Sequence, residues 1–308
     1  MSAPIRIIAG PTGAGKSTLA MAIAEASGAR IISADSRQIY RGFDIGTAKP
    51  THADRALVHH EGIDVAEPTE RWSAARWAKE AVRWLDDAAR ADVPALVVGG
   101  TGLWLRALVT PLAEEPPMDP ARRADLQASL GQHDTPTLRK LVEQLDPERA
   151  HLGRTQLLRA AEIALLTGKR QSDLHRAQAA SGAAARREAR WLIVDPGPPL
   201  QDRLERRLDA MFADGWADEV RHLMRSVPED APAWNACGYR EIRDGVRQGG
   251  DLSAARDAVR ISTRQYAKRQ RTWFRHQLND EPAVLRLDPR APDAVAQASR
   301  WFKEGAHA

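Results

Sequence analysis

The segment GPTGAGKS, residues 10–17, has the G-x-x-x-x-G-K-S spacing of a phosphate-binding loop. Glycines let backbone N–H groups converge on phosphate oxygens, and the N-terminus of a following helix adds the positive end of its dipole. Lys16 supplies a charge, and Ser17 offers a hydroxyl to Mg²⁺, which makes Ser17 the candidate metal ligand. The predicted polyphosphate-binding residues are Gly10, Pro11, Thr12, Gly13, Ala14, Gly15, Lys16 and Ser17.

A polar segment, residues 34–50, follows the next apolar run and has Asp35 near its start. An acid at the carboxyl end of a parallel strand lies where open α/β sheets bind their ligands. Long polar loops inside a compact domain are more often binding surfaces than plain connections. We interpret Asp35 as a base that takes a proton from a nucleophile, or as a metal ligand through water. A turn or helix cap is the alternative.

A third apolar run ends at the glycines of GGTGLW, residues 99–104, and Thr101 presents a hydroxyl at the same sheet edge. Enzymes that hydrolyse nucleoside triphosphates normally have a carboxylate there, which holds Mg²⁺ and positions the attacking water. This point of the sequence has no carboxylate. We infer that the loop binds a polyphosphate group that is released without being hydrolysed. ATP hydrolysis is then not the energy source of the reaction.

The segment 256–279 carries seven Lys or Arg residues against one acid, Asp257. On a helix, six of them fall within about one third of the circumference: Arg256, Arg260, Arg264, Lys268, Arg271 and Arg275. Like charges at i and i+4 destabilise a helix, and a polyanion would relieve this repulsion. We therefore predict contact with a nucleic acid, with a solvated face as the alternative. Tyr266 and Trp273 either stack on bases or belong to the core.

The elements that must position these residues follow from apolar periodicity. Strands are predicted at 4–10, 29–35 and 94–100, and helices at 16–28 and 73–91. This alternation indicates a parallel sheet with helices on its faces. Further patterns predict a strand at 190–197, an amphipathic helix at 199–225 and a long helix at 252–278.

Residues 121–190 form a block whose pattern is helical throughout, after the Pro-rich and acidic stretch 111–120. We predict a catalytic α/β core made of residues 1–114 and 191–308, and a helical insertion domain at 115–190. The insertion is rich in arginine and is expected to form a second wall of a nucleic-acid groove.

The composition limits the class of protein. With 308 residues, 43% of them hydrophobic, and no apolar run of 18 residues, the chain is predicted to be globular and cytoplasmic, without membrane contact. The single cysteine, Cys237, excludes an internal disulfide and a cysteine-rich zinc site. The net charge of +4 does not by itself indicate a nucleic-acid partner. We expect a monomer.

Seven segments resemble, in the same order, those of the tRNA dimethylallyltransferases: GPTGAGKS, DSRQIYRGFDIGTAKPT, VHHEGIDV, WSAARW, VVGGTGLWLRAL, GYREI and STRQYAKRQRTWFR. These enzymes transfer a five-carbon prenyl group to the exocyclic amine, N6, of the adenosine just 3′ of the tRNA anticodon. The resemblance implies an α/β fold, a P-loop NTPase-like parallel sheet core with an all-helical insertion domain. It extends over residues 5–280.

The resemblance also implies a role for each site residue. The loop 10–17 would hold the diphosphate of dimethylallyl diphosphate, which departs as pyrophosphate, with Mg²⁺ as cofactor. Asp35 would be the general base on the adenine amine, Thr101 would lie at the reacting centre, and Lys16 would neutralise the leaving group. The anticodon stem-loop is the implied partner, and its target adenine would unstack from the neighbouring bases to enter the active site. The implied tRNA-binding residues are Asp35, Ser36, Arg37, Gln38, Thr101, Arg123, Thr155, Gln156, Leu157, Leu158, Arg159, Arg260, Arg264, Gln265, Lys268, Arg271 and Arg275.

The sequence departs from the family pattern at a few points. Ala14 and Trp104 stand where many members have Ser and Tyr, and Glu61 where an aliphatic residue is frequent. In the insertion, GRTQLLRAAE, residues 153–162, replaces the family's DPxRLxRALE after a shortened segment.

Three other functions compete with this interpretation. An adenylate isopentenyltransferase uses the same donor on a free nucleotide and does not need the basic insertion or the basic helix. A small-molecule kinase would turn over ATP and would have a phosphoacceptor site in place of the polar segment. A nucleic-acid-binding ATPase would need the acid that is missing after the third strand.

Overall fold

The computed structural model describes residues 3–112, 116–181, 186–249, 251–278, 281 and 283–304. The chain divides into two compact units, one made of Met1–Val109 and Arg187–Ala308 and the other of Thr110–Arg186. The unit boundaries lie a few residues before the expected ones at 114/115 and 190/191. The chain leaves the first unit and returns to it at neighbouring points, because the backbone N–H of Arg187 donates to the carbonyl of Val109 at 2.8 Å.

The first unit is built on a six-stranded sheet in the order β3-β2-β4-β1-β5-β6, and every pairing is parallel. The strands are β1 (Ile5–Ala9), β2 (Arg30–Ser33), β3 (His60–Glu61), β4 (Ala95–Gly99), β5 (Ala189–Val194) and β6 (Val284–Leu287). The predicted parallel sheet is therefore confirmed, with the four predicted strands at its centre. The pattern did not predict β3 and β6, because β3 has two residues and β6 has two exposed residues.

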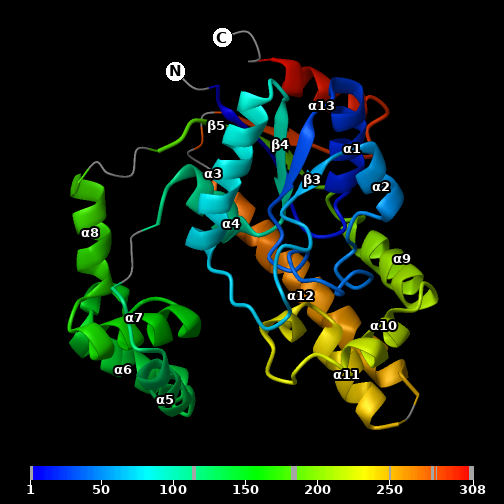
Figure 1. Cartoon of the computed structure of the whole chain (residues 1–308). Coiled ribbons are helices and arrows are strands. Elements are labelled where there is room, and N and C mark those ends of the chain that lie inside the picture. The colour runs from blue at the N-terminus through cyan, green and yellow to red at the C-terminus, as the bar shows by residue number, and fades with distance from the viewer. Residues whose placement is uncertain are drawn as a thin grey trace. The chain divides into compact units, whose positions relative to one another are not determined.

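Helices cover both faces of the sheet (Figure 1). On one face α1 (Lys16–Ser27) and α13 (Ala294–Lys303) share an apolar cluster with β1 and β4. On the other lie α3 (Ala74–Arg90) and α4 (Gly102–Val109), where the buried indole of Trp77 stacks on Trp104. Trp77 also donates to the carbonyl of Ser33 at 3.1 Å, which ties α3 to the end of β2. A short helix, α2 (His52–Leu57), lies between β2 and β3 in the chain.

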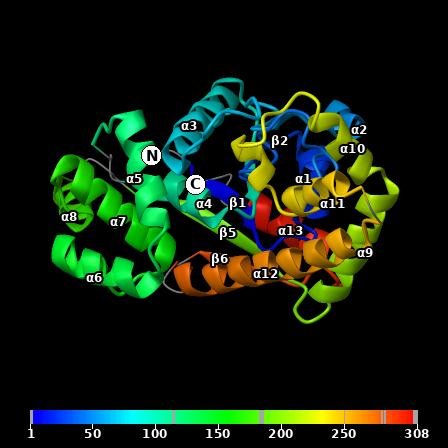
Figure 2. The same ribbon diagram turned by 90° about the horizontal axis from the view of Figure 1, so that it is seen from below.

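The C-terminal part adds four helices, α9 (Leu200–Ala213), α10 (Trp216–Leu223), α11 (Tyr239–Arg247) and α12 (Ser253–Gln277). The single helix expected at 199–225 was wrong, because Gly215, with a φ of 91°, interrupts it and separates α9 from α10. The long helix predicted at 252–278 is confirmed as α12. In Figure 2, α12 is the long helix that passes the carboxyl ends of the central strands, where Gln270 and Arg271 contact the segments after β1, β4 and β5.

The second unit consists, in its described residues, of the helices α5 (Pro120–Gly131), α6 (Thr135–Leu145), α7 (Arg154–Thr167) and α8 (Gln171–Ser181), with a 3₁₀ turn at Pro147–Arg149. It has its own apolar core of leucine, valine and alanine side chains from α5, α6 and α7. The fully buried Asp146 accepts from the backbone N–H and the hydroxyl of Ser172, and so caps the start of α8. None of the helices that the structure describes is long and apolar enough to span a bilayer.

Candidate active site

A cavity of about 960 Å³ opens at the carboxyl ends of β1, β2 and β4. The loop between β1 and α1 lines it with Gly13, and the first turn of α1 lines it with Lys16 and Ser17. Asp35, which follows β2, and Tyr266 of α12 also line it. The cavity thus brings together residues from three distant parts of the chain, at the sheet edge where open α/β folds bind their ligands.

The backbone of the loop 10–17 has positive φ at three glycines, Gly10, Gly13 and Gly15. Gly10 has a φ of 151°, and a Cβ there would lie 2.2 Å from the carbonyl oxygen of Val194. Gly15 has a φ of 96° directly before α1. Lys16 turns back over the loop, and its Nζ donates to the carbonyl of Pro11 at 2.8 Å. Burial lowers the pKa of Lys16 to about 8, against the opposing effect of Asp35.

Two arginines of α9 reach the same loop. The Nε of Arg203 donates to the carbonyl of Gly13 at 3.0 Å, and the Nη1 of Arg207 donates to the hydroxyl of Thr12 at 3.4 Å. Burial lowers the pKa of Arg207, and Asp35 opposes this effect. With Lys16, they make three cationic side chains around one loop. Sequence analysis missed both arginines, although each stands one residue before a buried leucine of α9, Leu204 or Leu208.

Asp35 and Tyr266 also line the cavity, and Thr101 lies beside Tyr266. The hydroxyl of Thr101 accepts from the backbone N–H of Ser36 at 3.0 Å and forms a hydrogen bond with the phenol of Tyr266. Burial raises the pKa of Tyr266, and the neighbouring Asp35 raises it further. Asp35 accepts from the backbone N–H of Arg37 at 2.8 Å, so the turn cap considered as its alternative role is present. Tyr266 lines the cavity and is not part of the apolar core, and its predicted stacking on a base stays a prediction.

Gln270 connects the loop 10–17 to the end of β4. Its Oε1 accepts from the backbone N–H of Thr12 at 2.7 Å, and its Nε2 donates to the carbonyl of Gly100 at 2.8 Å. The side chain is buried, and both of its polar atoms are used. The amide therefore fixes the loop 10–17 relative to the end of β4. Sequence analysis missed Gln270, because a glutamine within a basic helix gives no local signal of a buried amide.

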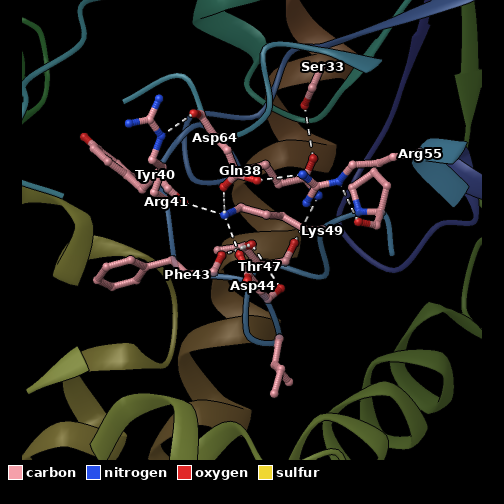
Figure 3. A network of polar contacts seen from close by, with 12 residues as sticks. Ser33, Gln38, Tyr40, Arg41, Phe43, Asp44, Thr47, Lys49, Arg55 and Asp64 are labelled. Atoms are coloured by element: carbon pink, nitrogen blue, oxygen red, sulfur yellow. Dashed lines mark hydrogen bonds and ion pairs between the residues drawn. The ribbon is translucent and has the colours of Figure 1, made fainter. Parts of the chain in front are cut away.

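The polar segment 34–50 is held by internal contacts (Figure 3). The Nε2 of Gln38 donates to the carbonyls of Thr47 and Ala48 at 3.1 and 3.0 Å, and its Oε1 accepts from the hydroxyl of Ser33. The buried ammonium of Lys49 contacts the carboxylates of Asp44 and Asp64. Gln38 was predicted to contact tRNA, and in the structure its amide is committed to the loop itself.

A family model described as IPP transferase matches residues 38–277, and one described as Isopentenyl transferase matches residues 3–61. The chain belongs to the IPP transferase family. Among the relatives of the chain, a tRNA dimethylallyltransferase of Gloeobacter violaceus is 40% identical over 93% of each chain, and one of a Caulobacter species is 40% identical over 92% of this chain and 94% of its own. The crystal structure of a tRNA isopentenylpyrophosphate transferase from Bacillus halodurans is 27% identical, covers 99% of both chains and has a TM-score of 0.69.

The residues of the insertion that were predicted to bind tRNA lie near the start of α7 and in α5. Leu157 is fully buried in the insertion's core, so its predicted contact with tRNA was wrong. Its position on the inner face of α7 explains this, because Ala160 and Ala161 of the same helix are buried beside it. Thr155 and Gln156 are exposed, Leu158 is half-buried, and the side chain of Gln156 accepts from the backbone N–H of Gly153. Arg123 and Arg159 both form ion pairs with the buried Glu162.

The basic stripe of α12 has acidic partners within the first unit. Arg260 and Arg264 bind Glu205 of α9 at 2.9 and 2.6 Å, Arg256 binds Asp209, and Arg271 binds Asp195. The repulsion within the stripe is therefore relieved in part inside the first unit, because α9 supplies acids that lie far from α12 in sequence. Among the described residues, Lys268 and Arg275 are exposed and form no ion pair. Gln265 is exposed too, and Trp273 packs on Gly102.

Proposed function

We propose that this protein transfers a dimethylallyl group from dimethylallyl diphosphate to N6 of the adenosine just 3′ of a tRNA anticodon, and releases pyrophosphate. The observation that carries the proposal is the cavity itself, in which three cationic side chains around the loop 10–17 face Asp35 and Tyr266, with Thr101 beside Tyr266. An anionic leaving group and a nucleophile that loses a proton need these two sets of residues. The relatives named tRNA dimethylallyltransferase support the choice of substrates.

The reaction follows from this arrangement. The N6 lone pair attacks C1 of the donor, the C1–O bond breaks with its electrons going to the diphosphate, and Asp35 takes the N6 proton. Lys16, Arg203 and Arg207 neutralise the charge that grows on the leaving diphosphate. Thr101 and Tyr266 bound the space beside Asp35 and orient the adenine. Catalysis comes mainly from positioning and charge neutralisation.

The loop 10–17 acts in this proposal as the phosphate cradle of a P-loop NTPase-like core, with Mg²⁺ as its cofactor. The donor set fits the metal, because Mg²⁺ keeps several waters and needs one hydroxyl and the substrate's phosphate oxygens rather than a protein cage. Ser17, at the start of α1 and in the cavity lining, is the residue that would hold it. The bound metal would add positive charge to the leaving diphosphate. We also propose that the protein works as a cytoplasmic monomer on the anticodon stem-loop.

In the decisive experiment the protein is incubated with unmodified tRNA, Mg²⁺ and dimethylallyl diphosphate. The tRNA is then digested to nucleosides, and their masses are measured by mass spectrometry. We expect a prenyl group on one adenosine per substrate tRNA and equimolar pyrophosphate. A parallel reaction with AMP as acceptor tests the adenylate alternative, and a reaction with ATP tests the kinase and ATPase alternatives. ATP hydrolysis or prenylated AMP, together with unchanged tRNA, would refute the proposal.

A further inference from the structure

Two side chains of the C-terminal helices hold the turn 43–48 of the polar segment. Glu219 of α10 accepts through Oε2 from the backbone N–H groups of Asp44 and Ile45, at 3.1 and 2.8 Å. The hydroxyl of Tyr239, the first residue of α11, accepts from the backbone N–H of Gly46 at 3.1 Å and donates to Oε1 of Glu219 at 2.6 Å. Three consecutive backbone N–H groups of the turn therefore donate to Glu219 and Tyr239.

The pair is placed in a largely apolar setting. Tyr239 is fully buried, and its ring packs against Phe43 and Trp216 with centroids 4.8 and 5.4 Å apart. Burial raises the pKa of Glu219. Among the described residues no lysine or arginine pairs with Glu219, so backbone dipoles and one phenol balance its charge. Loss of this carboxylate would leave the N–H groups of Asp44 and Ile45 without their acceptor, so Glu219 holds the backbone of the turn in place.

The turn is part of the cavity wall and leads to Asp35. Gly46, Thr47 and Lys49 line the cavity. The carbonyls of Thr47 and Ala48 accept from the amide of Gln38, which follows Asp35 by three residues. A chain of hydrogen bonds thus runs from Glu219 and Tyr239 through the turn and Gln38 to the segment that carries Asp35, as Figure 3 shows for its inner part.

We propose that Glu219 and Tyr239 are positioning residues for prenyl transfer, which fix the turn 43–48 as the wall against which the acceptor is held and through it the place of Asp35. The inference rests on the proposed function. Neither residue touches a substrate in this account. Their effect is on the distance between the acceptor and the base, to which turnover responds steeply.

The test compares Tyr239→Phe with a matched control, Tyr40→Phe. Both substitutions remove one buried hydroxyl and keep the ring and its contact with Phe43, but the hydroxyl of Tyr40 donates to the carbonyl of Glu70 at 3.1 Å and not to the turn. With both substrates saturating, well below each variant's Tm, we expect Tyr239→Phe to lower kcat about 10-fold and Tyr40→Phe to leave it within about 2-fold. The Kd of pyrophosphate should stay unchanged in both, because the loop 10–17 is untouched.

A second pair of variants checks the carboxylate. Glu219→Gln keeps an oxygen that accepts from the turn, whereas Glu219→Ala keeps none, so kcat should fall in the order wild type, Glu219→Gln, Glu219→Ala. If the wild-type protein is active, either of two results would overturn this inference alone. One is equal kcat for Tyr239→Phe and Tyr40→Phe, and the other is a Tyr239→Phe variant with a lower Tm but an unchanged kcat. A wild-type protein that transfers no prenyl group would overturn the proposed function and this inference with it.

Discussion

At the scale of single residues, Asp35 has two roles that the structure allows one substitution to separate. Its Oδ1 accepts from the backbone N–H of Arg37, and an asparagine would keep that acceptor while losing the basicity of the carboxylate. We expect Asp35→Asn to lower kcat about 10²-fold with little change in Tm. Enzyme assays and thermal unfolding of the same preparation measure both. A near-normal kcat of the Asp35→Asn variant would show that Asp35 only caps the turn and is not the general base.

From the lowered pKa of Lys16 we predict that diphosphate binding is coupled to proton uptake. Burial holds its pKa at about 8 in the free protein, and a diphosphate beside it would raise that pKa. Binding at pH 8 to 9 should therefore take up protons, and the affinity for pyrophosphate should fall as the pH rises above about 8. Calorimetry in two buffers of different ionisation enthalpy counts the protons. Lys16→Arg is the control, because an arginine stays charged over this range, and equal uptake by both proteins would contradict the assignment.

At the scale of elements, the contact between α12 and the loop 10–17 depends on Gln270. Gln270→Leu would leave the N–H of Thr12 and the carbonyl of Gly100 without their partner, at about 1–3 kcal/mol for each group. We expect a lower Tm and weaker pyrophosphate binding, measured by calorimetry. The control is Gln277→Leu on the same helix, whose exposed amide accepts from Arg106. If both variants bind pyrophosphate equally, Gln270 does not organise the loop.

Local signals predicted the elements themselves well. The glycine spacing of residues 10–17, the apolar runs of the central strands and the stop at Gly28 each act over a few residues, and the structure has them where expected. The break at Gly215 was missed, because apolar spacing continues from α9 into α10 across it. Short edge strands such as β3 carry too few residues for any periodicity.

At the scale of the whole molecule, the ion pairs of α12 change which charges are expected to meet RNA. Arg260 and Arg264 already bind Glu205, whereas Lys268 and Arg275 are exposed. We expect Lys268→Gln with Arg275→Gln to reduce the slope of log Kd for tRNA against log salt by about 1 to 2. The matched double variant, Arg260→Gln with Arg264→Gln, should reduce it less. An unchanged slope in the first double variant would place the stripe outside the tRNA contact.

The sequence by itself determined the parallel α/β core, the loop for a polyphosphate and the acid after the second strand, because spacing and periodicity encode them locally. Only the tertiary structure decided which side chains complete the site. Arg203, Arg207, Tyr266 and Gln270 reach the cavity because α9 and α12 pack at the carboxyl ends of the strands. Contacts between residues 65 to 258 positions apart depend on how helices pack, and no local pattern specifies that packing.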